Sequence, residues 1–270
     1  MLQRINMELE KIRIKKPLIL NFTNMVTMEF VANALLSLGA APLMSVSEQE
    51  VEDLVSLAHG VCVNIGTLDE RFVECCLSAA QMAQALGKPF ILDPVGAGAS
   101  RLRTQAALRL LPYANVVRGN ATEILALSGI AVESLGAESV HRPQEARETA
   151  VQVARKVGCV VVVSGSQDWV TDGSQEESVE FGSPVMSLVT GMGCALSAGI
   201  AAFMAVNGEA FSSALWATSY FGLCGQYAAR KAAHPGYFRA AFTDALHQGL
   251  RAQSDEFSHI FYNCFDARVK

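Results

Sequence analysis

Short, continuous runs of apolar residues recur along the first two-thirds of the chain. The plainest run is Cys159–Val163, and similar runs occupy 61–65, 89–93 and 115–118. Strands that are apolar on both faces are typical of parallel sheets covered by helices on both sides. The runs alternate with segments of helical periodicity, which predicts parallel strands joined by right-handed crossovers. We therefore expect an α/β fold.

The segments between these runs carry helix signals. Ser47–Glu50 has the form of a capping box ahead of an apolar stripe, and Gly60 is expected to end that helix. Apolar stripes predict three further helices at 69–86, 101–111 and 143–157. Together with the strands, these helices make a sheet with helices on its faces.

The pattern changes in the last third of the chain. Residues 169–171 and 178–181 flank an Asp-Gly turn, which predicts a β-hairpin. From Gly193 to about Leu250 the sequence is rich in Ala and helical in pattern. At the other end, apolar residues at helical spacing predict a short amphipathic helix within residues 1–16, packed on the edge of the fold. No linker or repeat is visible, so we expect one domain over residues 1–270.

Composition excludes several classes of protein. The net charge is -5, which argues against general binding to nucleic acid, because polyanions need clustered Lys and Arg. No run of 18 or more apolar residues occurs, so no segment is expected to span a membrane. The seven cysteines are odd in number and form no C-x-x-C pair. This cysteine usage suits a reducing cytoplasm better than disulfides or a zinc site.

Polar residues follow each predicted strand. In open parallel sheets, ligands bind outside the carboxyl ends of the strands. The polar loops at this edge are Asn21–Asn24, Asn64–Thr67, Asp93–Gly98, Arg118–Glu123 and Ser164–Ser166. Their convergence predicts a small-molecule site.

A glycine-rich turn at Thr190–Gly199 is the strongest single element. Gly191 and Gly193 precede a helix of small residues, so backbone N–H groups and the positive helix end can face an anion. This geometry suits a phosphoryl group in transfer. An equally weighted alternative is a turn beside a close helix packing contact. The chain has no P-loop, and Leu196 stands where a dinucleotide fingerprint needs its third glycine.

Two carboxylates follow buried strands. Asp93 precedes Pro94 and can hold Mg²⁺, although Asp before Pro is more often a turn or cap residue. Asn120 and Glu123 form a helix-capping pair, and Glu123 can also reach a metal. Arg118 beside them can pair with phosphate, or simply with a surface carboxylate.

Cys194 lies where a helix N-terminus favours a thiolate. A base at that position can accept the proton of an attacking hydroxyl. The alternative is a small buried residue chosen for its size.

The ordered motifs together resemble the hydroxyethylthiazole kinase family from about Pro17 to Ala229. The matching segments are Asn21–Asn24, Pro42–Ser45, Asn64–Thr67, Asp93–Gly98, Arg118–Asn120 with Glu123, and Gly191–Cys194. The resemblance implies a ribokinase-like three-layer α/β/α fold with a mostly parallel sheet and a helix-rich C-terminal third. It also implies ATP- and Mg²⁺-dependent phosphorylation of the hydroxyl of 4-methyl-5-(2-hydroxyethyl)thiazole in thiamine salvage, by a homotrimer with sites at its subunit interfaces.

The same resemblance implies roles for matching residues. Residues expected at the thiazole are Met44, Asn24, Gly66, Thr67 and Gly191. Residues expected at ATP are Arg118, Ser164 and Asn120. Mg²⁺ and phosphate are assigned to Asp93 and Glu123, and the anion hole and transfer to Gly191, Gly193 and Cys194. Related kinases have aspartate at the Cys194 position, where thiazole kinases often have cysteine.

Three alternatives remain open at this stage. One is a kinase of another small primary alcohol, such as hydroxymethylpyrimidine or pyridoxal. The second is a nucleotide-dependent NAD(P)H-hydrate dehydratase. For both of these, aspartate would be expected at position 194. The third is a nucleotide-binding protein without catalysis, because a fold alone does not fix chemistry.

Overall fold

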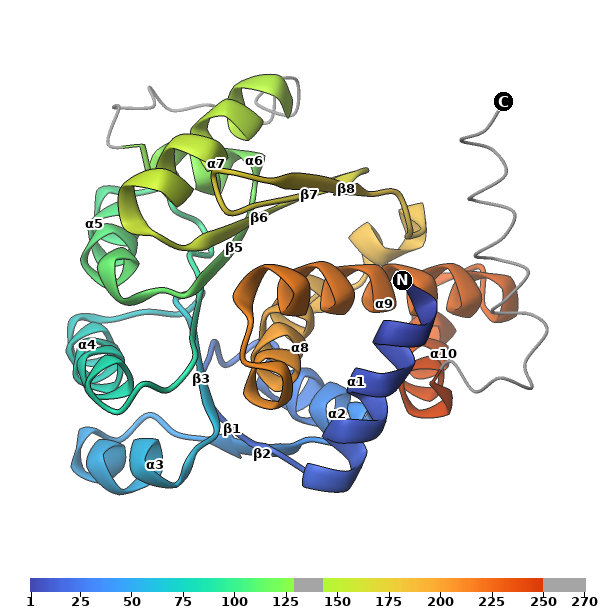
Figure 1. Cartoon of the computed structure of the whole chain (residues 1–270), viewed down its shortest axis with the longest axis horizontal. Helices are drawn as coiled ribbons and strands as arrows, with labels where there is room; N and C mark the ends of the chain where they lie inside the picture. Colours follow the sequence, from blue (N-terminus) through green and yellow to red (C-terminus); the bar gives the residue numbers. More distant parts are fainter. Residues whose placement is uncertain (129–142, 250–270) are drawn as a thin grey trace.

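The computed structural model describes residues 1–128 and 143–249. Within these residues an eight-stranded sheet has the order β2-β1-β3-β4-β5-β6-β7-β8 (Figure 1). Its strands are β1 (Leu18–Phe22), β2 (Ala41–Met44), β3 (Gly60–Asn64), β4 (Phe90–Asp93), β5 (Val116–Asn120), β6 (Val160–Ser164), β7 (Asp168–Thr171) and β8 (Glu176–Val179). Strands β1 to β6 pair in parallel, and β7 and β8 are antiparallel. The prediction of a mostly parallel sheet is confirmed.

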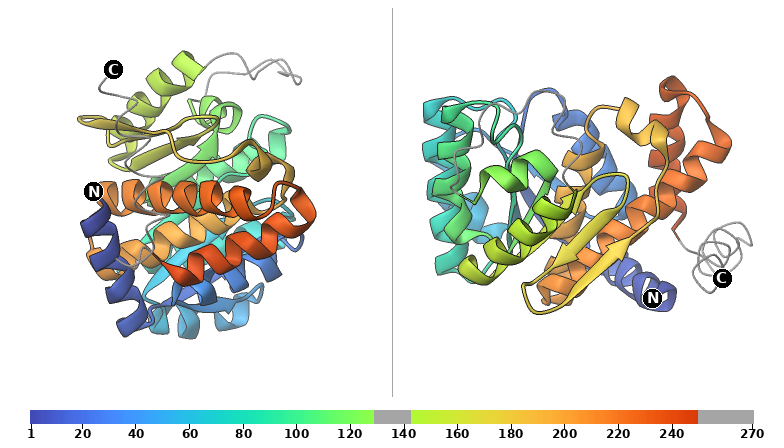
Figure 2. Two further views of the ribbon diagram at one scale, coloured as in Figure 1. Left: turned by 90° about the vertical axis from the view of Figure 1, so that its right-hand side faces the viewer. Right: turned by 90° about the horizontal axis from the view of Figure 1, so that it is seen from above.

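Helices cover both faces of the sheet (Figure 1). One layer contains α3 (Val51–Leu57), α4 (Glu70–Ala85), α5 (Arg101–Leu110), α6 (Ala121–Ala126) and α7 (Pro143–Val157). The other contains α1 (Leu2–Lys15), α2 (Met28–Leu38), α8 (Met192–Asn207), α9 (Ala210–Lys231) and α10 (Pro235–Gln248). Short 3₁₀ segments lie at Glu48–Glu50, Leu111–Tyr113 and Pro184–Leu188. The second layer faces the viewer in the left panel of Figure 2. The predicted three layers and the helix-rich C-terminal third are confirmed.

The apolar strands are explained by two cores. In β6, Val160 and Val162 pack into the core shared with α8 and α9, while Val161 and Val163 pack into the core on the other face. Consecutive side chains of a strand point to opposite faces, so a strand between two cores has to be apolar throughout. The sequence pattern therefore reports a sheet covered on both sides.

Several boundaries differ from the predictions. The side chain of Ser47 caps no helix, and α3 begins only at Val51 and ends at Leu57, so the predicted capping box is wrong. Gly60 does not end that helix, because it opens β3. The hairpin is confirmed, but its second strand starts two residues earlier than predicted, at Glu176. No helix in the described residues is both long and apolar enough to cross a membrane.

Candidate active site

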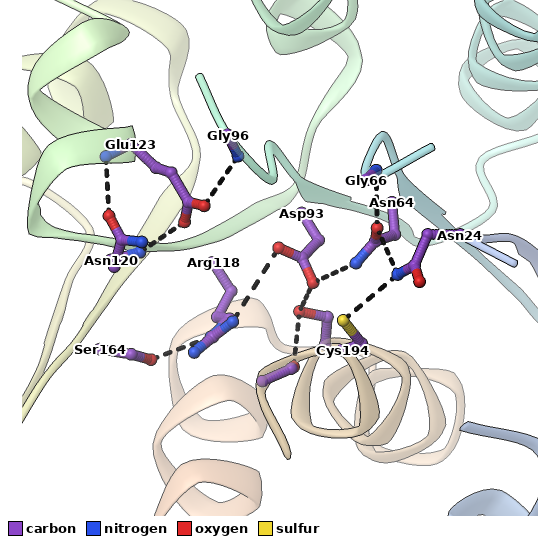
Figure 3. A network of polar contacts seen from close by, with 12 residues as sticks. Asn24, Asn64, Gly66, Asp93, Gly96, Arg118, Asn120, Glu123, Ser164 and Cys194 are labelled. Carbon is purple, nitrogen blue, oxygen red and sulfur yellow. Dashed lines mark hydrogen bonds and ion pairs between the residues drawn. The ribbon is translucent and has the colours of Figure 1, made fainter. Parts of the chain in front are cut away.

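The predicted polar loops meet at the carboxyl edge of the sheet. Strand β1 lies between β2 and β3, so the chain leaves β1 toward one side and later returns on the other. Such a reversal leaves a crevice beyond the strand ends, where open α/β sheets bind ligands. Asn24 follows β1, Asn64 ends β3 and Asp93 ends β4. These three side chains lie together in Figure 3.

Asp93 is the buried centre of the site and is fully inaccessible to solvent. Its Oδ2 accepts hydrogen bonds from Asn64 Nδ2 at 2.7 Å and from Ser197 Oγ at 2.9 Å. Its Oδ1 has no hydrogen-bond partner. Burial raises the pKa of Asp93 to about 6, while the nearby Arg118 guanidinium opposes the rise and the Glu123 carboxylate adds to it. One carboxylate oxygen is thus fixed and the other is available.

A chain of amides runs from Asp93 to the thiol. Asn64 donates to Asp93, so its Oδ1 is turned the other way and accepts from Asn24 Nδ2 at 3.0 Å. Asn24 Nδ2 also lies 3.4 Å from Cys194 Sγ (Figure 3). Burial, followed by the charge of Asp93, raises the pKa of the Cys194 thiol, so the thiol is neutral near neutral pH. The position is that of the predicted base, but its protonation state is that of an ordinary thiol.

The glycine-rich turn forms the N-terminus of α8. Gly191 is the N-cap, with φ of 96°, a conformation that glycine adopts without strain. A Cβ at this position would also lie 2.9 Å from the Phe30 ring. The free N–H groups of the first helical turn follow directly, and a helix start of this kind attracts anions. The close packing contact is therefore present, and the helix start has the geometry that the predicted anion site requires.

Arg118 connects this turn with the strands. Its Nε donates to Ser164 Oγ at 2.9 Å, and its Nη1 lies 3.9 Å from Asp93 Oδ1. Figure 3 shows the guanidinium between Asp93 and Ser164. The side chain is only 14% exposed, so its pairing is not that of a surface ion pair. A buried cation beside a helix N-terminus suits phosphate recognition.

Glu123 is engaged by backbone amides. Its Oε2 accepts from Asn120 N at 2.8 Å and completes a capping box with the Asn120 side chain. Its Oε1 accepts from Gly96 N at 2.9 Å (Figure 3). The capping prediction is confirmed. Glu123 ties the start of α6 to the loop after β4, which brings its charge near Asp93.

A cavity of about 660 Å³ opens beside the turn. Its lining includes the polar side chains of Arg118, Asn120 and Ser164 with the backbone of Gly193, and the apolar side chains of Phe181, Met186 and Phe221. Among its lining residues that the sequence did not single out as site residues are Asp168, Gly182, Ser183, Pro184, Thr218 and Gly222. Residues 181–189, which we call the strap, are irregular apart from one 3₁₀ segment. Their sequence has no periodicity from which a wall of the cavity could be predicted. A lining that combines polar and apolar side chains suits a nucleotide, which carries charged phosphates and an apolar base.

The strap can lie on α9 because α9 carries glycine where the two meet. A Cβ at Gly222 would lie 2.6 Å from Phe181 Cβ, and one at Gly225 would lie 2.2 Å from Met186 Sδ. Both glycines face the strap one helical turn apart. In the sequence, this wall of the cavity is signalled by two glycines, Gly222 and Gly225, within a helical segment.

Most of the residues expected at the thiazole lie outside this cavity. Met44 ends β2 and is half-buried, and Thr67 Oγ1 accepts from Met25 N at 3.0 Å. Gly66 leaves room for Asn24, since a Cβ there would lie 2.9 Å from Asn24 Cβ. Apart from Gly191, none of these residues lines the described cavity. Of this group, Asn24 lies next to the thiol, at 3.4 Å from Cys194 Sγ.

The donor set fits Mg²⁺ as a partner of phosphates. Within the described residues, no group of three His, Cys, Asp or Glu side chains forms a self-contained metal cage. Mg²⁺ in kinases is usually held by one or two carboxylates, by phosphates and by water. The unpartnered, buried Oδ1 of Asp93 is a ligand of this kind. The fit is therefore to a metal that arrives with a nucleotide.

Comparison with known proteins decides the family. The profile of the hydroxyethylthiazole kinase family matches residues 9–251. A hydroxyethylthiazole kinase from Chlamydia caviae is 41% identical over 249 residues, which cover 92% of this chain and 95% of that protein. The chain belongs to the hydroxyethylthiazole kinase family. This assignment confirms the resemblance seen in the motifs.

Solved structures agree with the family. The structure of the family member from Pyrococcus horikoshii OT3 superposes with a TM-score of 0.84 at 37% identity, covering 91% of this chain and 93% of that chain. A ribokinase-like superfamily protein from Enterococcus faecalis has a TM-score of 0.59 at 16% identity, covering 86% of each chain. The second likeness concerns the fold alone, which is the predicted ribokinase-like architecture.

Proposed function

We propose that the protein transfers the γ-phosphoryl group of ATP to the hydroxyl of 4-methyl-5-(2-hydroxyethyl)thiazole, as a Mg²⁺-dependent enzyme of thiamine salvage. The observation that carries the proposal is that an amide-lined helix start and a buried arginine line a cavity of about 660 Å³, while the buried carboxylate of Asp93 lies 3.9 Å from that arginine. This is the equipment that phosphoryl transfer needs, because its catalysis is mostly positioning and charge stabilisation. Family membership supplies the acceptor.

The nucleotide occupies the cavity in this proposal. Arg118 and Ser164 bind the phosphates, Asn120 lines the same cavity, and the apolar side chains of the lining receive the base. The free amides that follow Gly191, including those of Gly193 and Cys194, surround the outer phosphate. A phosphate bound there pairs with the Arg118 guanidinium, which is paired with Asp93 in the structure.

Asp93 and Glu123 serve Mg²⁺ in different ways. Oδ1 of Asp93 is free to bind the ion, while both Glu123 oxygens already accept backbone N–H groups and act through charge or through water. The ion, when bound, neutralises developing charge on the phosphates. The carboxylates hold it beside the phosphates.

The acceptor side lies beyond Cys194. Met44, Asn24, Gly66 and Thr67 contact the thiazole, and its hydroxyl reaches the thiol and the turn. A neutral thiol is a weak base, and burial raises its pKa further. Proton removal is therefore the lesser contribution, because a loose transition state leaves the attacking hydroxyl largely protonated until late. Cys194 mainly shapes the position of that hydroxyl.

The acceptor side also suggests the assembly. Met25 and Val26 are 74% and 73% exposed beside Thr67, although both are apolar. A neighbouring copy that covers them would close the thiazole site, which supports a homotrimer with sites at its interfaces. Phe30 and Val31, a few residues further along the chain, are buried in the core and are not available to such an interface.

Cellular location and domain organisation complete the proposal. The cysteines of the described residues are free thiols, and five of the six are buried in the cores. Free thiols persist in a reducing compartment, so we place the enzyme in the cytoplasm. Residues 1–270 act as one domain, with α1 on its edge.

Measuring ADP production with different acceptors tests the function. Purified protein with ATP and Mg²⁺ should turn over rapidly only when 4-methyl-5-(2-hydroxyethyl)thiazole is added. Hydroxymethylpyrimidine, pyridoxal and hydrated NADH serve as competing substrates. Faster turnover with any of these three, or none with any acceptor, would reject the assignment.

A further inference from the structure

Ser197 lies one helical turn after Gly193 and is fully buried. Its hydroxyl is 2.9 Å from Asp93 Oδ2 and 3.2 Å from the Gly193 carbonyl oxygen. A serine hydroxyl carries one proton, so it can donate to only one of these acceptors at a time. When it donates to Asp93, Ser197 links α8, which begins at the glycine turn, to the carboxylate.

The simplest alternative is a helix serine that bonds back to the carbonyl four residues earlier. Ser213 in α9 shows that arrangement, because it is equally buried and donates to the Glu209 carbonyl oxygen. Ser197 differs in having a nearer acceptor in Asp93. Hydrogen bonds to a charged acceptor are about twice as strong as neutral ones, so the proton belongs to the carboxylate whenever Asp93 is ionised.

Asn64 holds the same oxygen from the other side. Its Nδ2 donates to Asp93 Oδ2 at 2.7 Å, while its Oδ1 accepts from Gly66 N and Asn24 Nδ2 at 3.0 Å. With two donors on Oδ2, the carboxylate is held in one orientation, and Oδ1 accepts no hydrogen bond and has only the Arg118 guanidinium near it, at 3.9 Å. The amide of Asn64 also reaches Asn24 and, through it, the thiol of Cys194.

We propose that Ser197 and Asn64 are positioning residues of the kinase reaction. Both clamp Oδ2 of Asp93 so that Oδ1 is presented to a phosphate-bound divalent cation. Asn64 has a second task, because it also orients the Asn24 side chain next to Cys194. This inference rests on the proposed function, since it assigns Asp93 to the nucleotide's metal ion.

The two residues should fail in different ways when they are replaced. Loss of Ser197 frees one side of the carboxylate and leaves the acceptor side untouched. Loss of Asn64 disturbs both sides. Partners that orient a metal ligand typically change metal affinity by about 10- to 100-fold when removed.

Calorimetry gives the dissociation constant of ADP, once with Mg²⁺ and once with EDTA. The ratio of the two constants measures how well Asp93 is positioned for the metal ion, without any turnover. In the wild type, Mg²⁺ should tighten ADP binding. In Ser197→Ala, the ratio of the two dissociation constants should fall by about 10-fold or more, while the constant in EDTA stays within about twofold of the wild type. Ser213→Ala is the matched control and should keep both constants.

The KM for the thiazole alcohol distinguishes the role of Asn64 from that of Ser197. The KM for the thiazole alcohol should be unchanged in Ser197→Ala and raised several-fold in Asn64→Ala. If Ser197→Ala does not fold, Ser197→Cys keeps the size of the side chain and replaces the hydroxyl by a weaker donor, with a smaller loss in the same ratio.

Two results would overturn the inference: a wild-type ratio in Ser197→Ala, or ADP binding by the wild type that is indifferent to Mg²⁺. The proposed function fails separately, if the wild type binds ADP with Mg²⁺ but does not phosphorylate the thiazole alcohol.

Discussion

The guanidinium of Arg118 rests directly on the backbone of Gly193, because a Cβ at position 193 would lie 2.1 Å from Arg118 Nη1. Gly193 therefore leaves the space that the guanidinium occupies. Its backbone has no positive φ, so another residue would be tolerated by the helix itself. Glycine is required at this position because a side chain would displace Arg118.

Gly193→Ala should consequently spare the fold and damage the site. The methyl group has to displace the arginine from Ser164 and Asp93, so we expect the KM for ATP to rise by about 10-fold or more, as for the loss of a charged hydrogen bond. Thermal unfolding should change little, because alanine favours the helix. An unaltered KM would show that Arg118 does not bind the phosphates in this position.

Gly191→Ala should behave in the opposite way. Its φ of 96° and a Cβ distance of 2.9 Å to Phe30 oppose any side chain. We expect a loss of about 1–3 kcal/mol in the free energy of unfolding, measured with urea. Stability equal to that of Gly193→Ala would contradict this description of the turn.

Cys194→Asp should retain or raise the rate of phosphorylation. A carboxylate accepts the hydroxyl proton more readily than the neutral thiol, whose pKa is raised by burial and by Asp93. Initial rates with saturating ATP and thiazole alcohol measure this. Complete loss of turnover with an intact fold would show that the thiol itself is required.

Glu123→Gln should weaken both the fold and the response to Mg²⁺. The amide keeps one acceptor but turns an NH₂ group toward the N–H of Gly96 or Asn120, so about 1–3 kcal/mol of stability should be lost. The Mg²⁺ concentration for half-maximal activity should rise as well. An unchanged metal titration would leave Glu123 with its capping role alone.

Asp93→Asn should make the protein more stable and inactive. Burial raises the pKa of Asp93 to about 6, above its ordinary value of 3.8, so the folded protein resists ionisation of this group. The wild type therefore loses stability as pH rises through about 6, by roughly 1–3 kcal/mol. The variant should be more stable by that amount near pH 8 and lose the advantage below about pH 4, as measured by urea unfolding. A variant less stable at both values would contradict the account of Asp93.

Much of the fold could be predicted because its strands are short and fully buried. Val160 to Val163 feed two cores in alternation, so burial alone makes the run apolar. The capping pair Asn120 and Glu123 could also be predicted, since both partners are local in sequence. In contrast, β2 is a half-buried edge strand that contains Pro42, a residue that weakens the case for a strand, so its short apolar run is not a clear signal.

The rest of the site depends on contacts that are distant in sequence. Ser197 looks like any small residue of a helix until Asp93, 104 residues away, is placed against it. The strap across α9 has no periodicity, and its place follows from Gly222 and Gly225 facing Phe181 and Met186. Sequence patterns report local periodicity, whereas these walls and clamps arise from tertiary packing.

A crystal structure with Mg²⁺, a nonhydrolysable ATP analogue and the thiazole alcohol tests the central claim most directly. The account predicts the outer phosphate on the amides of residues 191–194, within reach of Arg118 and next to Asp93, with the alcohol oxygen beside Cys194. A triphosphate whose outer group lies away from the turn at Gly191, or an alcohol bound on the far side of the sheet, would contradict it.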